Sequence, residues 1–122
     1  MNIRATREGG WYRFAVLDLG SAHWTPSTFF PQLDSAQDRV KMALAEDPNV
    51  RILFDLSALI TIDSSLITLV VQTIRLSGTG RVSVIVSSPD VYSWLALLGI
   101  DRLADVYNSE QEWREQQGGS QP

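Results

Sequence analysis

The stretch that decides the fold runs from Arg51 to Ser65 and reads R-I-L-F-D-L-S-A-L-I-T-I-D-S-S. Its beginning belongs to a compact apolar run over residues 50–56, which is typical of a buried strand. A short loop follows, and the Asp-Ser-Ser group at 63–65 has the side-chain chemistry that begins a helix. The helical pattern continues over 66–77 and Gly78 ends it. The stretch therefore predicts a buried strand, a short loop and a capped helix.

The segments before this stretch predict two more strands and a helix. Residues 12–19 are rich in aromatic and branched side chains and stop at Gly20, which favours a strand. Residues 2–6 are expected to form a short edge strand beside it. A helix follows, because apolar residues recur at helical spacing until Pro48 and Asn49 stop the pattern; they are Leu33, Ala36, Val40 and Leu44.

The segments after it repeat the alternation of strand and helix. Residues 82–86 read as a buried strand, and Ser88-Pro89 opens the next helix with proline at its favoured first position. The predicted apolar stripe of that helix is Val91, Trp94, Leu95 and Leu98, and Gly99 ends it.

The C-terminal part predicts one more strand and one more helix. Residues 103–107 form the short last strand, and Ser109 followed by Glu112 is a capping box for the final helix. The expected domain is residues 1–116, and the polar, glycine-rich residues 117–122 are expected to be a disordered tail.

The element order is therefore β-β-α-β-α-β-α-β-α. Strands that alternate with helices predict an α/β fold, with one mixed, mostly parallel sheet of about five strands and four helices. In such sheets, functional sites gather where strands end and helices begin.

The composition argues against an enzyme. The 122 residues contain no cysteine and one histidine, His23, so a thiolate metal site, a disulfide and a Cys/His nucleophile pair are excluded. The only lysine is Lys41, and no phosphate-binding loop ends in Gly-Lys-Ser/Thr. We therefore expect no catalytic residue, no metal and no cofactor.

Charge and hydropathy predict the localisation of the protein and argue against two kinds of partner, nucleic acid and membrane. Ten basic and fourteen acidic residues give a net charge of −4, which argues against direct nucleic-acid binding. No window approaches the ~20 apolar residues that cross a bilayer, and the polar N-terminus does not look like a signal peptide. Together with the lack of cysteine, this favours a cytoplasmic protein without membrane insertion.

Three aspartates lie at or near predicted strand ends: Asp18, Asp55 and Asp63. Clustered carboxylates could bind Mg²⁺ or contribute to a small-ligand site. The alternative is that they terminate strands and cap helices, which are positions that prefer aspartate.

Three segments in order carry a family resemblance. They are the 51–65 stretch, the helix start Ser87-Ser88-Pro89-Asp90-Val91, and Leu97-Leu98-Gly99-Ile100-Asp101-Arg102-Leu103 at the end of that helix. This arrangement resembles the STAS domain, the fold of bacterial anti-sigma factor antagonists. The resemblance covers roughly residues 10–116.

The resemblance implies a function in signal transduction. Antagonists of this family bind an anti-sigma factor that is also a serine kinase and binds the ATP. The kinase phosphorylates a serine at the start of the second long helix, the complex separates, and a serine phosphatase reverses the change. That serine corresponds to Ser64, with Ser65 as the second candidate hydroxyl. The implied role is regulation of transcription by a phosphoprotein through partner switching.

One position departs from the family pattern. Antagonists usually carry glycine after the Ser-Ser or Ser-Thr pair, whereas this chain has Leu66. A leucine there could crowd the approach of a kinase. This keeps open a second interpretation, a STAS scaffold or lipid-transporter subunit that is not phosphorylated. A third is a small-ligand or nucleotide-binding module.

Helical periodicity assigns the faces of the helix that begins at 64. Ser64, Thr68 and Arg75 fall on one side of this helix. The opposite side is the core face, which consists of Leu66, Ile67, Val70, Val71 and Ile74. Leu69 and Leu76 lie on one flank, where they form a partner stripe unless a neighbouring helix or loop covers them. The candidate partner-binding residues are Asp63, Ser64, Ser65, Leu66, Leu69, Gln72 and Leu76.

The aromatic segment 23–30 has two interpretations. His23, Trp24, Phe29 and Phe30 flank Thr25-Pro26 between a predicted strand and helix. An aromatic-rich loop is either an interaction patch or packing over a sheet edge. His23 has no acidic or metal partner at motif spacing, so no catalysis is assigned to it.

Overall fold

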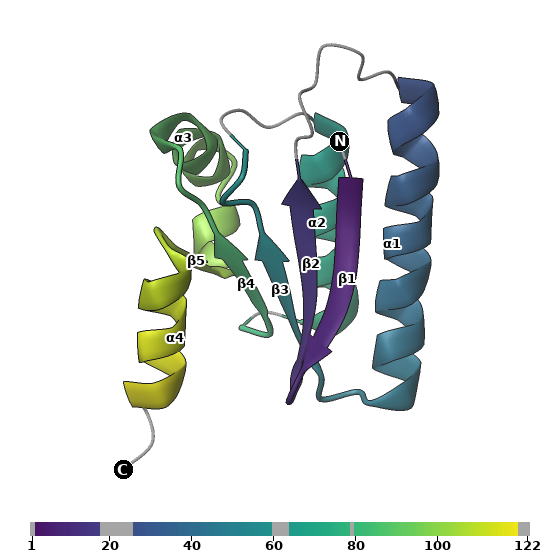
Figure 1. Cartoon of the computed structure of the whole chain (residues 1–122), viewed down its shortest axis with the longest axis horizontal. Helices are drawn as coiled ribbons and strands as arrows, with labels where there is room; N and C mark the ends of the chain where they lie inside the picture. The colour runs from purple at the N-terminus through teal and green to yellow at the C-terminus, as the bar shows by residue number, and fades with distance from the viewer. Residues whose placement is uncertain (1, 18–25, 60–63, 79, 120–122) are drawn as a thin grey trace.

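One five-stranded sheet with four helices makes up the fold in this computed structural model, which describes residues 2–17, 26–59, 64–78 and 80–119 (Figure 1). The strands are β1 (Asn2–Glu8), β2 (Trp11–Leu17), β3 (Arg51–Asp55), β4 (Val82–Ile85) and β5 (Asp105–Tyr107). The helices are α1 (Pro26–Glu46), α2 (Ser64–Ser77), α3 (Pro89–Leu97) and α4 (Glu110–Gly119), with the short 3-10 helix η2 (Ile100–Arg102). The predicted fold class and element order are confirmed.

The strands lie in the order in which they occur along the chain. β1 pairs antiparallel with β2, and β2, β3, β4 and β5 pair in parallel. The register aligns Ala5, Phe14, Phe54, Val84 and Val106 in one row across the sheet. All five belong to the main core or pack against it, so the row defines one apolar face.

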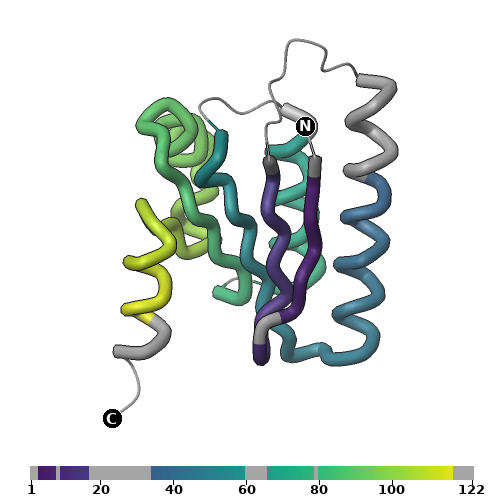
Figure 2. The backbone as a smooth tube through the Cα atoms, viewed as in Figure 1, coloured from purple at the N-terminus to yellow at the C-terminus, as the bar shows by residue number. Residues whose placement is uncertain are grey.

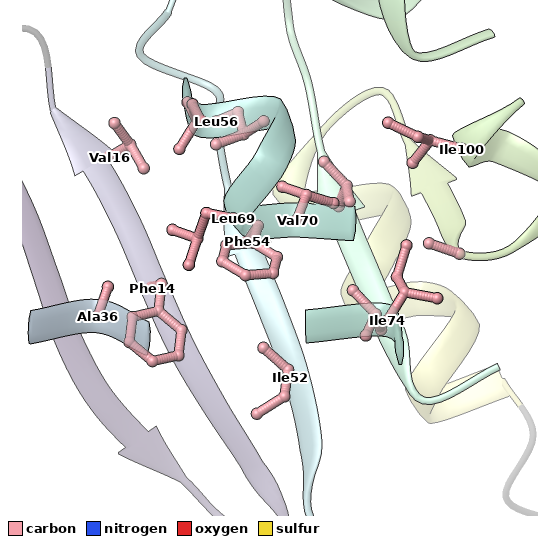
Figure 3. Packing of buried hydrophobic residues seen from close by; sticks show 14 of the residues in the cluster. Phe14, Val16, Ala36, Ile52, Phe54, Leu56, Leu69, Val70, Ile74 and Ile100 are labelled. Atoms are coloured by element: carbon pink, nitrogen blue, oxygen red, sulfur yellow. The ribbon is translucent and has the colours of Figure 1, made fainter. Parts of the chain in front are cut away.

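Helices α1, α2 and α3 cover this face. Connections between parallel neighbours are right-handed, so successive crossover helices fall on the same side of a sheet. Figure 3 shows Phe14, Phe54 and Leu69 meeting between the sheet and α2, and the rings of Phe14 and Phe54 stack with centroids 5.7 Å apart. Val91 and Leu95 of α3 are buried in the same cluster.

Helix α4 covers part of the opposite face. Its Trp113 is buried beside Leu53 and Ile85, and its ring meets Trp11 edge-on at 5.3 Å. β3 therefore carries apolar side chains on both faces, which explains why the sequence shows an unbroken apolar run there. Figure 2 shows α1 beside β1 at one end of the sheet and α4 beside β5 at the other.

The predicted caps of two helices are present. The hydroxyl of Ser88 accepts a hydrogen bond from the N–H of Asp90 at 3.2 Å, with Pro89 in the first turn of α3. At α4, the hydroxyl of Ser109 accepts from the N–H of Glu112 at 3.0 Å. These side chains satisfy backbone donors that a helix start leaves unpaired.

Three expectations need correction. α1 begins at Pro26, so Phe29 and Phe30 lie in a helix and not in a loop; proline at the first position favours this earlier start. α4 continues through Gly119, past residue 117, where the tail was expected to begin. In α3, Trp94 and Leu98 are 44% and 50% exposed, because only Val91 and Leu95 face the sheet.

Candidate functional site

The predicted switch serine lies at the start of α2. Ser64 is the first residue of α2 and Ser65 the second, while Asp63 lies outside the described residues. β3 and β4 are parallel, so the helices that follow them, α2 and α3, begin near the same edge of the sheet (Figure 1). This is the edge at which α/β proteins place their functional sites.

The predicted faces of α2 are confirmed for most positions. Leu66, Val70 and Ile74 are buried in the core, and Thr68 and Arg75 are exposed on the opposite side. The side chain of Leu66 has no exposed surface, so it occupies the core below the helix start. It cannot itself be a contact residue for a partner, which corrects its place in the predicted binding set.

The place of Leu69 in the predicted binding set also needs correction. Of the two interpretations of its flank, a partner stripe or a surface covered by a neighbouring element, the second applies to it, because only 1% of Leu69 is exposed. The reason is α1, which lies beside α2 on that flank, where the side-chain amide of Gln37 donates to the amide oxygen of Gln72 at 2.6 Å. The alternative that a neighbouring helix covers this flank therefore applies to Leu69.

The rest of the flank remains at the surface. Leu76 is 52% exposed, and Gln72 is exposed although it bonds to Gln37. Of the predicted binding set, the described accessible side chains are therefore Gln72 and Leu76.

The aspartate predictions have different outcomes. Asp18 and Asp63 lie outside the described residues, as do His23 and Trp24 of the aromatic segment. Asp55, at the end of β3, is buried and forms an ion pair with Arg13 of β2. Within the described ranges, no three acidic, histidine or cysteine side chains gather as a metal site requires.

Asp55 belongs to a polar network that the sequence analysis did not identify. The Arg13 guanidinium contacts Asp55 and also Glu110, the first residue of α4. The second carboxylate oxygen of Asp55 accepts from the N–H of Ser57 at 3.1 Å and from its hydroxyl at 2.5 Å. The carbonyl of Ser57 in turn accepts from the hydroxyl of Ser87 at 2.5 Å. The signal for this network is a charge, Asp55, directly after the apolar residues 52–54 of β3.

The network shifts the pKa of its charged groups. Burial is the largest influence on Asp55 and would raise its pKa, but hydrogen bonds from Ser57 and Arg13 outweigh it and hold that pKa below its ordinary value. The hydrogen bond from Arg13 is the largest influence on Glu110, and it lowers the pKa of that carboxyl. Burial opposes the charge of Arg13, but its two carboxylate partners raise its pKa above the ordinary value.

We expect the protein to lose stability in acid as this network protonates. Because the pKa values of Asp55 and Glu110 are lower in the folded state, the unfolded chain binds protons first. Their stabilisation is complete above about pH 4–5 and is lost as pH falls through the folded-state values. Urea unfolding measured between pH 7 and pH 3 checks this. The variant Glu110→Gln should show a shallower loss, and a pH profile identical to that of the natural chain would contradict the assignment.

A small groove lies where α3 begins. It has a volume of about 260 Å³ and its lining includes Ser87, Ser88, Tyr92 and Asn108. Sites for small ligands usually measure ~300–1,000 Å³ and are largely apolar. The groove is therefore smaller than a typical ligand site.

No helix in the described part of the chain is both long enough and apolar enough to span a membrane.

Solved structures of anti-sigma factor antagonists resemble this chain over nearly its full length. SpoIIAA in its unphosphorylated form gives a TM-score of 0.70 at 16% identity, over 96% of each chain. A STAS domain protein from Planctomyces limnophilus gives 0.64 at 20% identity, covering 92% of this chain and 94% of that one. An antagonist from Mycobacterium paratuberculosis gives 0.61 at 16% identity, covering 90% and 87%.

Sequence comparison adds no further assignment, because no family model and no curated protein matches the chain. The shared architecture defines the class: this chain has the fold of a STAS domain, as the sequence analysis predicted.

Proposed function

We propose that this protein is an anti-sigma factor antagonist that is switched off by phosphorylation at Ser64. The observation that carries the proposal is the position of Ser64, the first residue of α2 at the carboxyl edge of the parallel strands. The solved proteins that share this fold include antagonists, and one of them is described in its unphosphorylated form. The partner would be an anti-sigma factor serine kinase in the cytoplasm, and a serine phosphatase would reset the switch.

The start of a helix suits a reversible negative charge. Its first backbone N–H groups lack partners in the helix and can donate hydrogen bonds to an anion. A phosphate adds about −1.5 to −2 charge, and the helix returns ~0.3–1 kcal/mol of favourable interaction. The domain should therefore stay folded when it is modified, while an interface at the same place loses affinity.

The burial of Leu66 supports this proposal. The side chain points into the core, so it does not occupy the space above the helix start that a kinase would need. The chain can thus carry leucine where the family usually has glycine without the crowding that the sequence suggests. The exposed Gln72 and Leu76 continue the proposed binding surface along α2.

Phosphorylation can be tested with the anti-sigma factor kinase of the same organism and ATP. We expect intact-mass analysis to show one added phosphate on the natural chain and on Ser65→Ala, and none on Ser64→Ala. If Ser64→Ala is still modified once and Ser65→Ala is not, the switch lies at Ser65. Stable binding of the kinase without any added phosphate would contradict the switch and favour a scaffold or lipid-transporter subunit.

A further inference from the structure

The guanidinium of Arg13 joins two elements that are far apart in the sequence. One of its nitrogens contacts carboxylates of both Asp55 and Glu110, which lie 42 and 97 residues further along the chain. The side chain of Arg13 is 14% exposed and that of Asp55 is 12% exposed, whereas that of Glu110 is 44% exposed. A partly desolvated arginine between two carboxylates is held much more firmly than a surface ion pair.

Asp55 extends this restraint into the segment that leads to α2. Its other oxygen fixes the N–H and hydroxyl of Ser57, while Ser87 holds the carbonyl of Ser57 from the β4–α3 connection. Two residues later, Leu59 is buried, and its N–H bonds to the carbonyl of Leu56 at 3.0 Å. The chain is thus anchored up to Leu59, five residues before Ser64.

α4 is held to the sheet by few side chains. Trp113 is its only buried residue among residues 110–116, and Glu110 supplies its ion pair with Arg13. The indole N–H of Trp113 is buried, and no acceptor among the described residues contacts it, which weakens the docking of the helix. The other described α4 side chains are polar, so α4 can leave the sheet without exposing a second apolar anchor of its own.

We propose that Arg13 is a positioning residue that transmits the docking of α4 to the β3–α2 connection and so sets the presentation of Ser64. When α4 is docked, Glu110 fixes the guanidinium against Asp55, and Asp55 fixes Ser57. When α4 moves away, the guanidinium keeps Asp55 but loses Glu110, so Asp55, and Ser57 with it, are held less firmly. The part of the proposal that concerns Ser64 rests on the proposed function, whereas the coupling from Glu110 to Ser57 does not.

Amide hydrogen exchange of the full chain tests the coupling. In Glu110→Ala we expect the N–H of Ser57 to exchange about tenfold faster, because its acceptor Asp55 is less restrained. The conservative Glu110→Gln keeps an oxygen acceptor without the charge and should give an intermediate rate. The N–H of Val84, in the middle of the sheet, reports global opening and should change less than that of Ser57.

The matched control is Glu115→Ala, the same change on the same helix at an exposed residue that pairs with Gln111. It should leave the exchange of Ser57 unchanged. An unchanged Ser57 rate in Glu110→Ala, or an equal acceleration in Glu115→Ala, would overturn the coupling.

Phosphorylation kinetics test the consequence at Ser64. With the anti-sigma factor kinase we expect Glu110→Ala to raise KM several-fold at nearly constant kcat, because it alters presentation and not the chemistry. An unchanged KM together with faster Ser57 exchange would overturn the link to Ser64. If no kinase modifies the chain, the proposed function fails while the exchange data still decide the coupling.

Discussion

If the proposed function holds, replacing Ser64 with aspartate is expected to weaken binding to the proposed anti-sigma factor partner by about a hundredfold, which corresponds to ~3 kcal/mol. A carboxylate at the first residue of α2 imitates part of the charge of a phosphate. The helix start tolerates that charge. A partner surface does not, because an apolar surface would desolvate the carboxylate and an acidic surface would repel it, and both effects lower the affinity. Titration calorimetry with the natural chain and Ser64→Asp measures the difference.

Two further measurements separate a local effect from a general one. Ser35→Asp places the same charge on an exposed serine in the interior of α1 and should bind as the natural chain does. Thermal unfolding should show that Ser64→Asp remains as stable as the natural chain. If Ser64→Asp binds with the affinity of the natural chain, the switch is contradicted, because the interface then does not require an uncharged residue at position 64.

Truncating Leu69 to alanine is expected to cost about 2–5 kcal/mol of stability, the range for a buried leucine. The side chain is 1% exposed and fills the space between the sheet, α1 and α2 (Figure 3). Leu76→Ala, one heptad along the same flank, should change stability by only about 0.5 kcal/mol or less, because that leucine is 52% exposed. Urea unfolding of both variants measures the two values.

The same pair of variants distinguishes core from contact surface in a binding assay. Leu76→Ala should lower affinity for the anti-sigma factor more than it lowers stability. Leu69→Ala should lower stability more than affinity, where the affinity is calculated for the folded fraction of the protein. Equal stability losses in the two variants would contradict the different burial of the two leucines.

Local sequence patterns predicted the helices and strands, because each of these elements is marked by its own residues. The unbroken apolar run of β3 reflects burial on both faces, and the serines at 88 and 109 mark helix starts that the structure confirms. Helical spacing alone predicted which side of α2 is buried in the core. It did not predict the burial of Leu69 on the flank, because that burial depends on α1, whose position relative to α2 is set by the whole sheet.

The polar network lay beyond sequence reasoning for a related reason. Arg13, Asp55 and Glu110 stand on three separate elements, and no spacing along the chain indicates that they meet. The strand-end position of Asp55 suggested a cap or a metal ligand, and both are local interpretations. The pairing of β2 with β3 brings Arg13 to that carboxylate, and the docking of α4 brings Glu110 to the same guanidinium.

The docking of α4 also has a consequence during synthesis. The sheet face that carries Leu53 and Ile85 can be assembled as soon as β4 has left the ribosome, but its cover, Trp113, lies 28 residues after Ile85 and is made later. Until then Leu53 and Ile85 lie uncovered on that face, and exposed apolar side chains favour aggregation. A chain that stops before residue 110 should therefore keep most of its core and still be poorly soluble.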